Sequence, residues 1–258
     1  MNNGNIKRGF KYEQGSVLTK RTIMTGDLQI LLEYEDNLKA SKDDFKIAVM
    51  EHNCLQKRTE SNRRYTLNYL QNLYSLDLNN LIFLGMRSFL EKDRKSFPLI
   101  AGLTAFCRDS IYTDSFPFIK KLVFGEQSNK TDFEQFIENV YPGRFSEKML
   151  QSLVRNLQSS WTQSGHLQGR NNKIRTEIEP TTAAVAYALF LGYLKGIRGQ
   201  NLFLSEYITF LDCGYEKAIE YTETASMRGW LDLNKVGDVI EVRFPGIISD
   251  LELEGINE

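Results

Sequence analysis

The stretch SSWTQSGHLQGRNNKIRTEIEPT, residues 159–181, decides the fold of the region around it. It completes a segment, 146–163, whose apolar residues recur with the spacing of an amphipathic helix. Gly165 is a natural stop for that helix, because glycine readily adopts the left-handed conformation that follows a helix end. Two short apolar stretches separated by a polar turn come next, which is the pattern of a β-hairpin. Trp161 lies on the apolar face of the helix, so we interpret it as a core residue.

The same order of helix, glycine, strand, turn and strand recurs at 215–244. Most of the remaining chain shows helical patterns. The very apolar run 183–194 is too short to cross a membrane and predicts a buried helix. The sequence therefore predicts a mainly α protein, a multi-helix bundle with two winged-helix-like units that each combine a helix with a β-hairpin.

Changes in composition divide the chain into five segments. We expect a basic N-terminal arm at 1–22, an N-terminal helical domain at 23–125, and a winged-helix-like domain with a basic wing at 126–180. A C-terminal helical and winged-helix-like domain follows at 181–246. The last segment, 247–258, is an acidic tail with four acids and no base.

Charge distinguishes the two helix-plus-hairpin units. Six basic residues and one acid lie between Arg144 and Thr176, although the whole chain has 32 basic and 33 acidic residues. A winged helix places its helix in the major groove and its wing on the DNA backbone. The candidate DNA contacts here are Lys148, Arg155, Arg170, Lys173 and Arg175, the last three at the wing tip. Neutral donors suited to phosphates and base edges accompany them: Gln151, Asn156, Gln158, Gln163 and Asn171.

The ordinary alternative for this segment is a solvated helix face beside a charged hairpin tip. The helix of the second unit differs because Glu216, Glu220 and Glu223 would repel phosphate. We therefore interpret 215–244 as a structural or protein-contacting unit.

A second group of cations lies near the N-terminal end of the segment 54–77, which has helical periodicity. It consists of Lys57, Arg58, Arg63 and Arg64. Positive charge at a helix start is unfavourable to the helix dipole, so these residues favour an external anionic partner such as DNA.

No motif indicates an enzyme. His52 and His166 are isolated, and the chain has no phosphate-binding glycine loop and no metal-binding helix motif. We expect no catalytic residue, no metal and no cofactor. Three scattered cysteines favour reduced thiols, and the polar N-terminus predicts no signal peptide, so we expect a cytoplasmic protein without membrane association.

Several motifs together resemble a known family. They are TGDLQILLEYED (25–36), EHNCLQKRT (51–59) followed by Arg63 and Arg64, an apolar helix pair at 96–123, and WTQSGHL (161–167). Their order and spacing resemble the BrxA family of the BREX bacteriophage-exclusion systems, over about residues 20 to 180. The positions that match the family pattern are Asn53, Leu55, Gln56, Lys57, Arg58, Arg64, Gly165 and Leu167.

The resemblance implies a non-enzymatic, mainly helical, cytoplasmic protein that binds double-stranded DNA and acts beside a methyltransferase and an ATPase in phage defence. Of the matching positions, Lys57, Arg58 and Arg64 are suited to phosphate contact. The first part of such proteins is also similar to a helical RNA-binding antitermination fold.

We therefore expect a DNA-binding accessory protein that contacts mainly the phosphate backbone. Two alternatives stay open. One is a protein–protein adaptor within a defence complex, which the neutral net charge, the acidic tail and the acidic second helix favour. The other is an RNA-binding helical protein.

Overall fold

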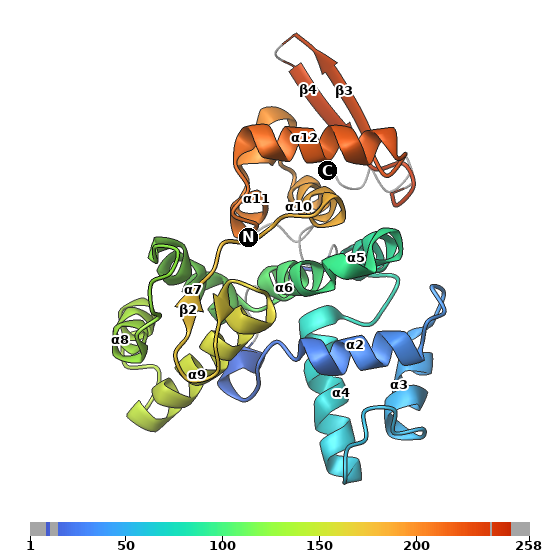
Figure 1. The fold of residues 1–258 in the computed structure, drawn as a ribbon. Coiled ribbons are helices and arrows are strands. Elements are labelled where there is room, and N and C mark those ends of the chain that lie inside the picture. The colour runs from blue at the N-terminus through green and yellow to red at the C-terminus, as the bar shows by residue number, and fades with distance from the viewer. Residues whose placement is uncertain (1–8, 11–14, 238, 249–258) are drawn as a thin grey trace. The chain divides into compact units, whose positions relative to one another are not determined.

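The computed structural model describes residues 9–10, 15–237 and 239–248 (Figure 1). The chain divides into two compact units, each assembled from segments that are distant in sequence. Unit 1 combines Met1–Phe10, Asn79–Leu103 and Ile178–Glu258; unit 2 combines Lys11–Leu78 and Thr104–Glu177. The boundary at Leu103 falls within helix α6 (Phe97–Arg108). The five-segment division along the sequence stays a prediction. Lys7, Arg8 and Lys11 of the expected arm, and residues 249–258 of the expected tail, lie outside the described residues.

The first half of unit 2 has three helices after a single 3-10 turn, η1 (Val17–Thr19). They are α2 (Thr25–Tyr34), α3 (Lys42–Met50) and α4 (Glu60–Tyr74). Local side chains define two of the helix starts. Ser41 and Asp44 form a reciprocal capping box at α3, and the Thr59 hydroxyl accepts from the Asn62 amide at α4.

The second half of unit 2 carries the first helix-plus-hairpin unit. Its elements are α7 (Ser110–Lys121), α8 (Lys130–Val140), α9 (Glu147–Gln163), β1 (Leu167–Gln168) and β2 (Ile174–Arg175). β1 and β2 pair in antiparallel register, with Leu167 opposite Arg175. The short segment 125–128 between α7 and α8 bonds to the other edge of β2, where Gly125, Glu126 and Ser128 pair with Lys173 and Arg175 and Gln127 lies opposite Ile174. This order of a helix, a bridging segment, two helices and a hairpin is winged-helix-like.

Unit 1 is organised around the apolar helix α10 (Thr182–Leu194), of which every residue from Ala183 to Leu194 is buried. α10 packs against α5 (Leu81–Lys92), where Gly85 has no side chain and leaves room for the ring of Phe190. The remaining elements are η2 (Arg94–Ser96), η3 (Gly199–Leu204), α11 (Glu206–Phe210), α12 (Tyr215–Met227), β3 (Asp232–Val236) and β4 (Val239–Arg243). In Figure 1 the β3–β4 hairpin lies beside α12.

The predicted fold class is confirmed. The described residues form eleven α-helices and two small two-stranded sheets, each of which follows a helix. The 183–194 run is a buried helix, as expected. Within the described part of the chain, no helix is both long and apolar enough to pass through a bilayer.

Candidate nucleic-acid interface

The turn from α9 into the hairpin is fixed by backbone geometry. Gly165 has a φ of 89°, and the next amide, that of His166, donates to the Trp161 carbonyl at 2.9 Å. A left-handed glycine closes the helix end in this way and redirects the chain. The chain then enters β1, and Thr176 beyond β2 donates its amide back to the His166 carbonyl at 2.9 Å. Gly165 therefore sets where the wing begins, as the sequence predicted.

A buried aromatic cluster packs around Trp161 of α9. Trp161 is fully buried, with ring centroids 4.2 Å from Tyr112 and 5.6 Å from Phe116. Its indole N–H donates to the Ser115 hydroxyl at 3.0 Å. The prediction that Trp161 is a core residue is confirmed. His166 is also fully buried, and its Nδ1 lies 2.9 Å from the Ser164 hydroxyl, so its ring is part of this core.

The segment 125–128 supports the wing through backbone hydrogen bonds to β2. The amides of Gly125 and Arg175 exchange bonds with carbonyls across the 125–128 segment and β2, at 2.9 and 2.8 Å. The buried Gln158 of α9 donates its amide group to the Ser128 carbonyl at 2.7 Å. Helix and wing are thus joined by hydrogen bonds through this short segment.

Arg175 does not belong to an exposed wing tip, and this prediction is wrong. It is only 2% exposed, and its guanidinium donates to the carbonyl oxygens of His166 and Thr176. The guanidinium also lies 5.1 Å from the centroid of the Phe124 ring. Alternation along β2 turns Arg175 inward, and the long side chain satisfies carbonyls at the base of the hairpin. Its guanidinium is buried and bonded within the base of the hairpin.

The exposed part of the wing carries Arg170 and Lys173. Arg170 is exposed, whereas Lys173 is half-buried and donates from Nζ to the Gly169 carbonyl at 2.7 Å. Desolvation, and then the nearby charge of Lys130, lower the pKa of Lys173. Lys130, the exposed first residue of α8, therefore joins the wing cations, although the sequence pattern gave no reason to include it.

On α9 the cations and the neutral donors have different roles. Lys148 and Arg155 are exposed, as expected for DNA contacts. The expected neutral donors Asn156, Gln158 and Gln163 are instead bonded within unit 2, to the Leu18 carbonyl, the Ser128 carbonyl and the Thr22 hydroxyl. Periodicity placed these amides on α9 but could not show that other segments cover them. The exposed charged residues of α9 are Lys148 and Arg155, together with Glu147 at its start.

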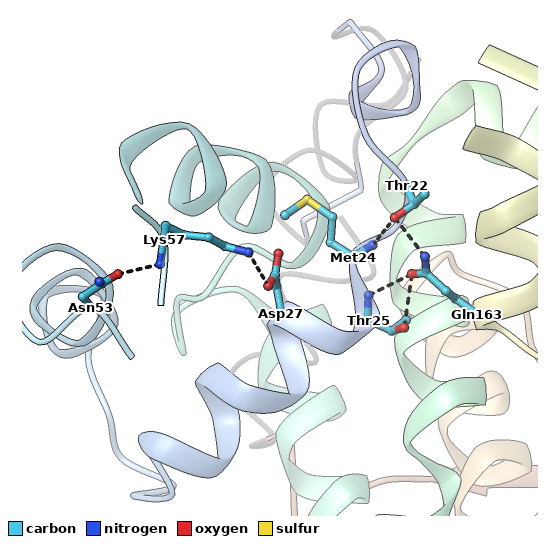
Figure 2. Close-up of polar contacts among 7 residues, drawn as sticks. All are labelled: Thr22, Met24, Thr25, Asp27, Asn53, Lys57 and Gln163. Atoms are coloured by element: carbon cyan, nitrogen blue, oxygen red, sulfur yellow. Dashed lines mark hydrogen bonds and ion pairs between the residues drawn. The ribbon is translucent and has the colours of Figure 1, made fainter. Parts of the chain in front are cut away.

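Gln163 has a structural role that joins α9 to α2 (Figure 2). Its carboxamide oxygen accepts from the Thr25 amide at 3.0 Å and from the Thr25 hydroxyl at 3.2 Å, while its nitrogen donates to Thr22 at 2.9 Å. Met24, before the helix, is left-handed with a φ of 55° and makes no side-chain cap bond. A side chain distant in sequence thus supplies the missing cap.

The four cations of the 57–64 region divide into structural and exposed groups. Lys57 forms a 2.7 Å ion pair with Asp27, so its charge is already compensated and it is not a free phosphate contact (Figure 2). Arg58 and Arg64 are exposed, and the guanidinium of Arg64 lies 5.9 Å from the centroid of the Tyr65 ring. Arg63 is half-buried, with an Nε that has no hydrogen-bond partner. Arg58 and Arg64 are thus the residues of this group best exposed to a nucleic acid.

All nine predicted contacts belong to unit 2. Five of them are exposed cations: Arg58, Arg64, Lys148, Arg155 and Arg170. Comparison with known proteins adds nothing to this geometry, since no protein-family model and no curated protein matches the chain.

Proposed function

We propose that this chain is a non-enzymatic accessory protein of a bacterial phage-defence system and that it binds the phosphate backbone of duplex DNA. The observation that carries this proposal is the combination of a winged-helix order of elements with exposed Lys148 and Arg155 on α9 and Arg170 on the wing. Backbone contacts provide affinity with little base preference. Three of the five expected neutral donors, Asn156, Gln158 and Gln163, are bonded to other segments of the chain, which favours this backbone mode further.

The cellular setting rests on the resemblance to the BrxA family. In that setting the protein acts in the cytoplasm beside a methyltransferase and an ATPase of a BREX-like system. The motif EHNCLQKRT and the helix end WTQSGHL support this assignment. In the structure Asn53, Lys57 and Gly165 of these motifs have defined local roles, so the motif residues contribute to the fold as well as to any interface.

A paired charge reversal tests the DNA-binding proposal. Arg155→Glu with Arg170→Glu should weaken binding to a duplex of about two helical turns, and lower the salt dependence of log K by about two. Fluorescence anisotropy measures both quantities. The matched control is Lys235→Glu with Arg243→Glu on the second hairpin, which makes the same change in net charge. Equal losses from the two double variants would reject the proposed surface.

A protein–protein adaptor is the second candidate, and unit 1 favours it. Three exposed apolar side chains lie on α12 and the second hairpin: Met227 at the end of α12, and Val236 and Val239 on either side of the hairpin turn, at 81, 78 and 71% exposure. An adaptor would show no duplex binding at low salt while it still co-purifies with the other defence proteins. Competition between duplex DNA and duplex RNA for the wild-type protein separates DNA binding from the RNA-binding alternative.

A further inference from the structure

The polar segment that precedes α2 is held between two helices of unit 2. The Asn156 amide of α9 donates to the Leu18 carbonyl at 2.8 Å, and the Ile23 amide donates to Ser160 of α9 at 3.0 Å. On the other side, the Tyr74 hydroxyl of α4 donates to the Ile23 carbonyl at 2.5 Å. Residues 16–25 therefore form a bridge from α9 to α4.

A buried carboxylate fixes the start of this bridge. Asp109, only 3% exposed, accepts from the Ser16 hydroxyl at 2.7 Å and from the Val17 amide at 2.8 Å. It also caps α7 by accepting from the Tyr112 amide at 3.2 Å. A charge-assisted acceptor with several donors holds its partners firmly. The backbone leading to Lys20 and Arg21 is thus anchored to the winged-helix part of unit 2.

Lys20 and Arg21 are the exposed cations of this bridge. The guanidinium of Arg21 lies 5.7 Å from the centroid of the Tyr69 ring on α4. Tyr65 is one helical turn earlier on the same face of α4, is 53% exposed, and has Arg64 beside it. A cation–π contact restrains a long arginine and so reduces the entropy lost when that arginine binds a phosphate.

We propose that Lys20 and Arg21 join the α9 cations to the α4 cations in one continuous strip, which binds the phosphate backbone of a single DNA duplex. The strip runs from Arg155 through Lys20 and Arg21 to Arg64, with Tyr65 and Tyr69 between the arginines. This inference rests on the proposed function and extends it. The arginines beside the tyrosine rings compete with bases for those ring faces, which favours phosphate binding over the stacking of single-stranded bases.

The test is duplex binding by Lys20→Glu with Arg21→Glu, followed by anisotropy over a range of salt concentrations. The strip predicts a loss of affinity of roughly tenfold or more and a salt slope smaller by about two. The control is Lys39→Glu with Lys46→Glu, two exposed lysines of the same unit outside the strip. It should retain nearly wild-type binding. Arg21→Lys keeps the charge but not the planar contact with Tyr69, so it should give an intermediate loss.

Stoichiometry provides a second readout. One continuous strip binds one duplex of about two helical turns per chain, whereas two separate sites bind two. Unchanged duplex binding by the Lys20/Arg21 variant, a second duplex per chain, or stronger binding to single strands would each overturn the strip. The proposed function itself is rejected if the wild-type protein binds no duplex DNA, which is a different outcome from rejection of the strip. If Arg155→Glu with Arg170→Glu weakens binding and the Lys20/Arg21 variant does not, only the strip is rejected.

Discussion

The two helix-plus-hairpin units use the same helix end for different purposes. At the end of α9 the His166 amide donates to the Trp161 carbonyl, and at the end of α12 the Trp230 amide donates to the Ala225 carbonyl in the same way. Left-handed Gly165 and Gly229 precede these donors. The local geometry of helix, glycine and hairpin is thus common to both, and the differences lie in the side chains around it.

Those side chains give the helix-plus-hairpin unit of α9 a supported, basic wing. They give the helix-plus-hairpin unit of α12 a longer hairpin of mixed charge. The strands β1 and β2 have two residues each, and β2 is also bridged by the segment 125–128, whereas β3 and β4 have five residues each. The last residue of β2, Arg175, is buried, while the last residue of β4, Arg243, is exposed and paired with Glu241 at 2.7 Å. The same backbone arrangement therefore gives either a supported cationic surface or an exposed hairpin, depending on which side chains are buried.

The largest difference in stability between the two helix-plus-hairpin units should appear when Trp161, the buried tryptophan of α9, is replaced by alanine. Trp161→Ala removes a fully buried indole and leaves Ser115 without its donor, so it should lower the free energy of unfolding of unit 2 by about 3–5 kcal/mol. Urea unfolding followed by circular dichroism measures this. Trp230→Ala, at a half-buried position after α12, should cost less. A loss below about 1 kcal/mol for Trp161→Ala would contradict the assigned core.

The two strand-end arginines offer a direct contrast. Arg175→Ala removes the guanidinium that donates to the His166 and Thr176 carbonyls, although the His166 carbonyl keeps the Thr176 amide as a donor, and it should destabilise unit 2 by about 1–3 kcal/mol. Arg243→Ala should leave the urea midpoint unchanged, because that side chain is exposed. Trp161 fluorescence reports on unit 2 and Trp230 fluorescence on unit 1. Equal shifts of the urea midpoint for Arg175→Ala and Arg243→Ala would contradict this distinction between the two hairpins.

Corresponding polar residues in the two helices sharpen the comparison. Gln158→Leu breaks the link from α9 to the Ser128 carbonyl and should cost about 1–2 kcal/mol. At the corresponding place in α12, the Thr222 hydroxyl only donates to the Ala218 carbonyl of its own helix, so Thr222→Val should cost less. Hydrogen exchange at Arg175, whose amide bonds to Glu126, should accelerate only in the Gln158 variant.

The smallest effect concerns pH and the wing. The pKa of Lys173 is lowered, so its ammonium loses its proton at a lower pH than an ordinary lysine, with pKa of about 10.4. Only the charged form binds phosphate, and DNA affinity should decline as pH rises through this lowered pKa. Lys173→Arg should flatten this decline, since arginine stays charged. An identical profile for the wild type and Lys173→Arg would show that Lys173 does not contact DNA.

The sequence predicted most of the architecture because helix periodicity and caps are local. The buried run 183–194 and the helix stop at Gly165 are both confirmed, and the caps at Ser41 and Thr59 are made by side chains next to the helices that they start. Tertiary contacts limited the rest. The start of α2 is completed by Gln163 of α9, a residue distant in sequence that a local pattern cannot reveal.

The candidate site was harder to predict, since residue type does not reveal which cations are already paired. Arg175 and Lys57 have the chemistry of phosphate contacts, yet burial and the Asp27 carboxylate commit them to the fold. Conversely, Lys130 and Arg21 become candidates only when the chain brings them beside Lys173 and Tyr69. Charge counts along the sequence located the basic unit but not its exposed members.

A salt titration of duplex binding by the wild-type protein tests the central claim most directly. Five exposed cations, with any contribution from Lys20 and Arg21, predict a plot of log K against log salt with a slope between about −4 and −6 for duplex DNA. The slope should be clearly less steep for Arg155→Glu with Arg170→Glu and nearly unchanged for Lys235→Glu with Arg243→Glu. A flat salt dependence, or no binding at low salt, would contradict the account.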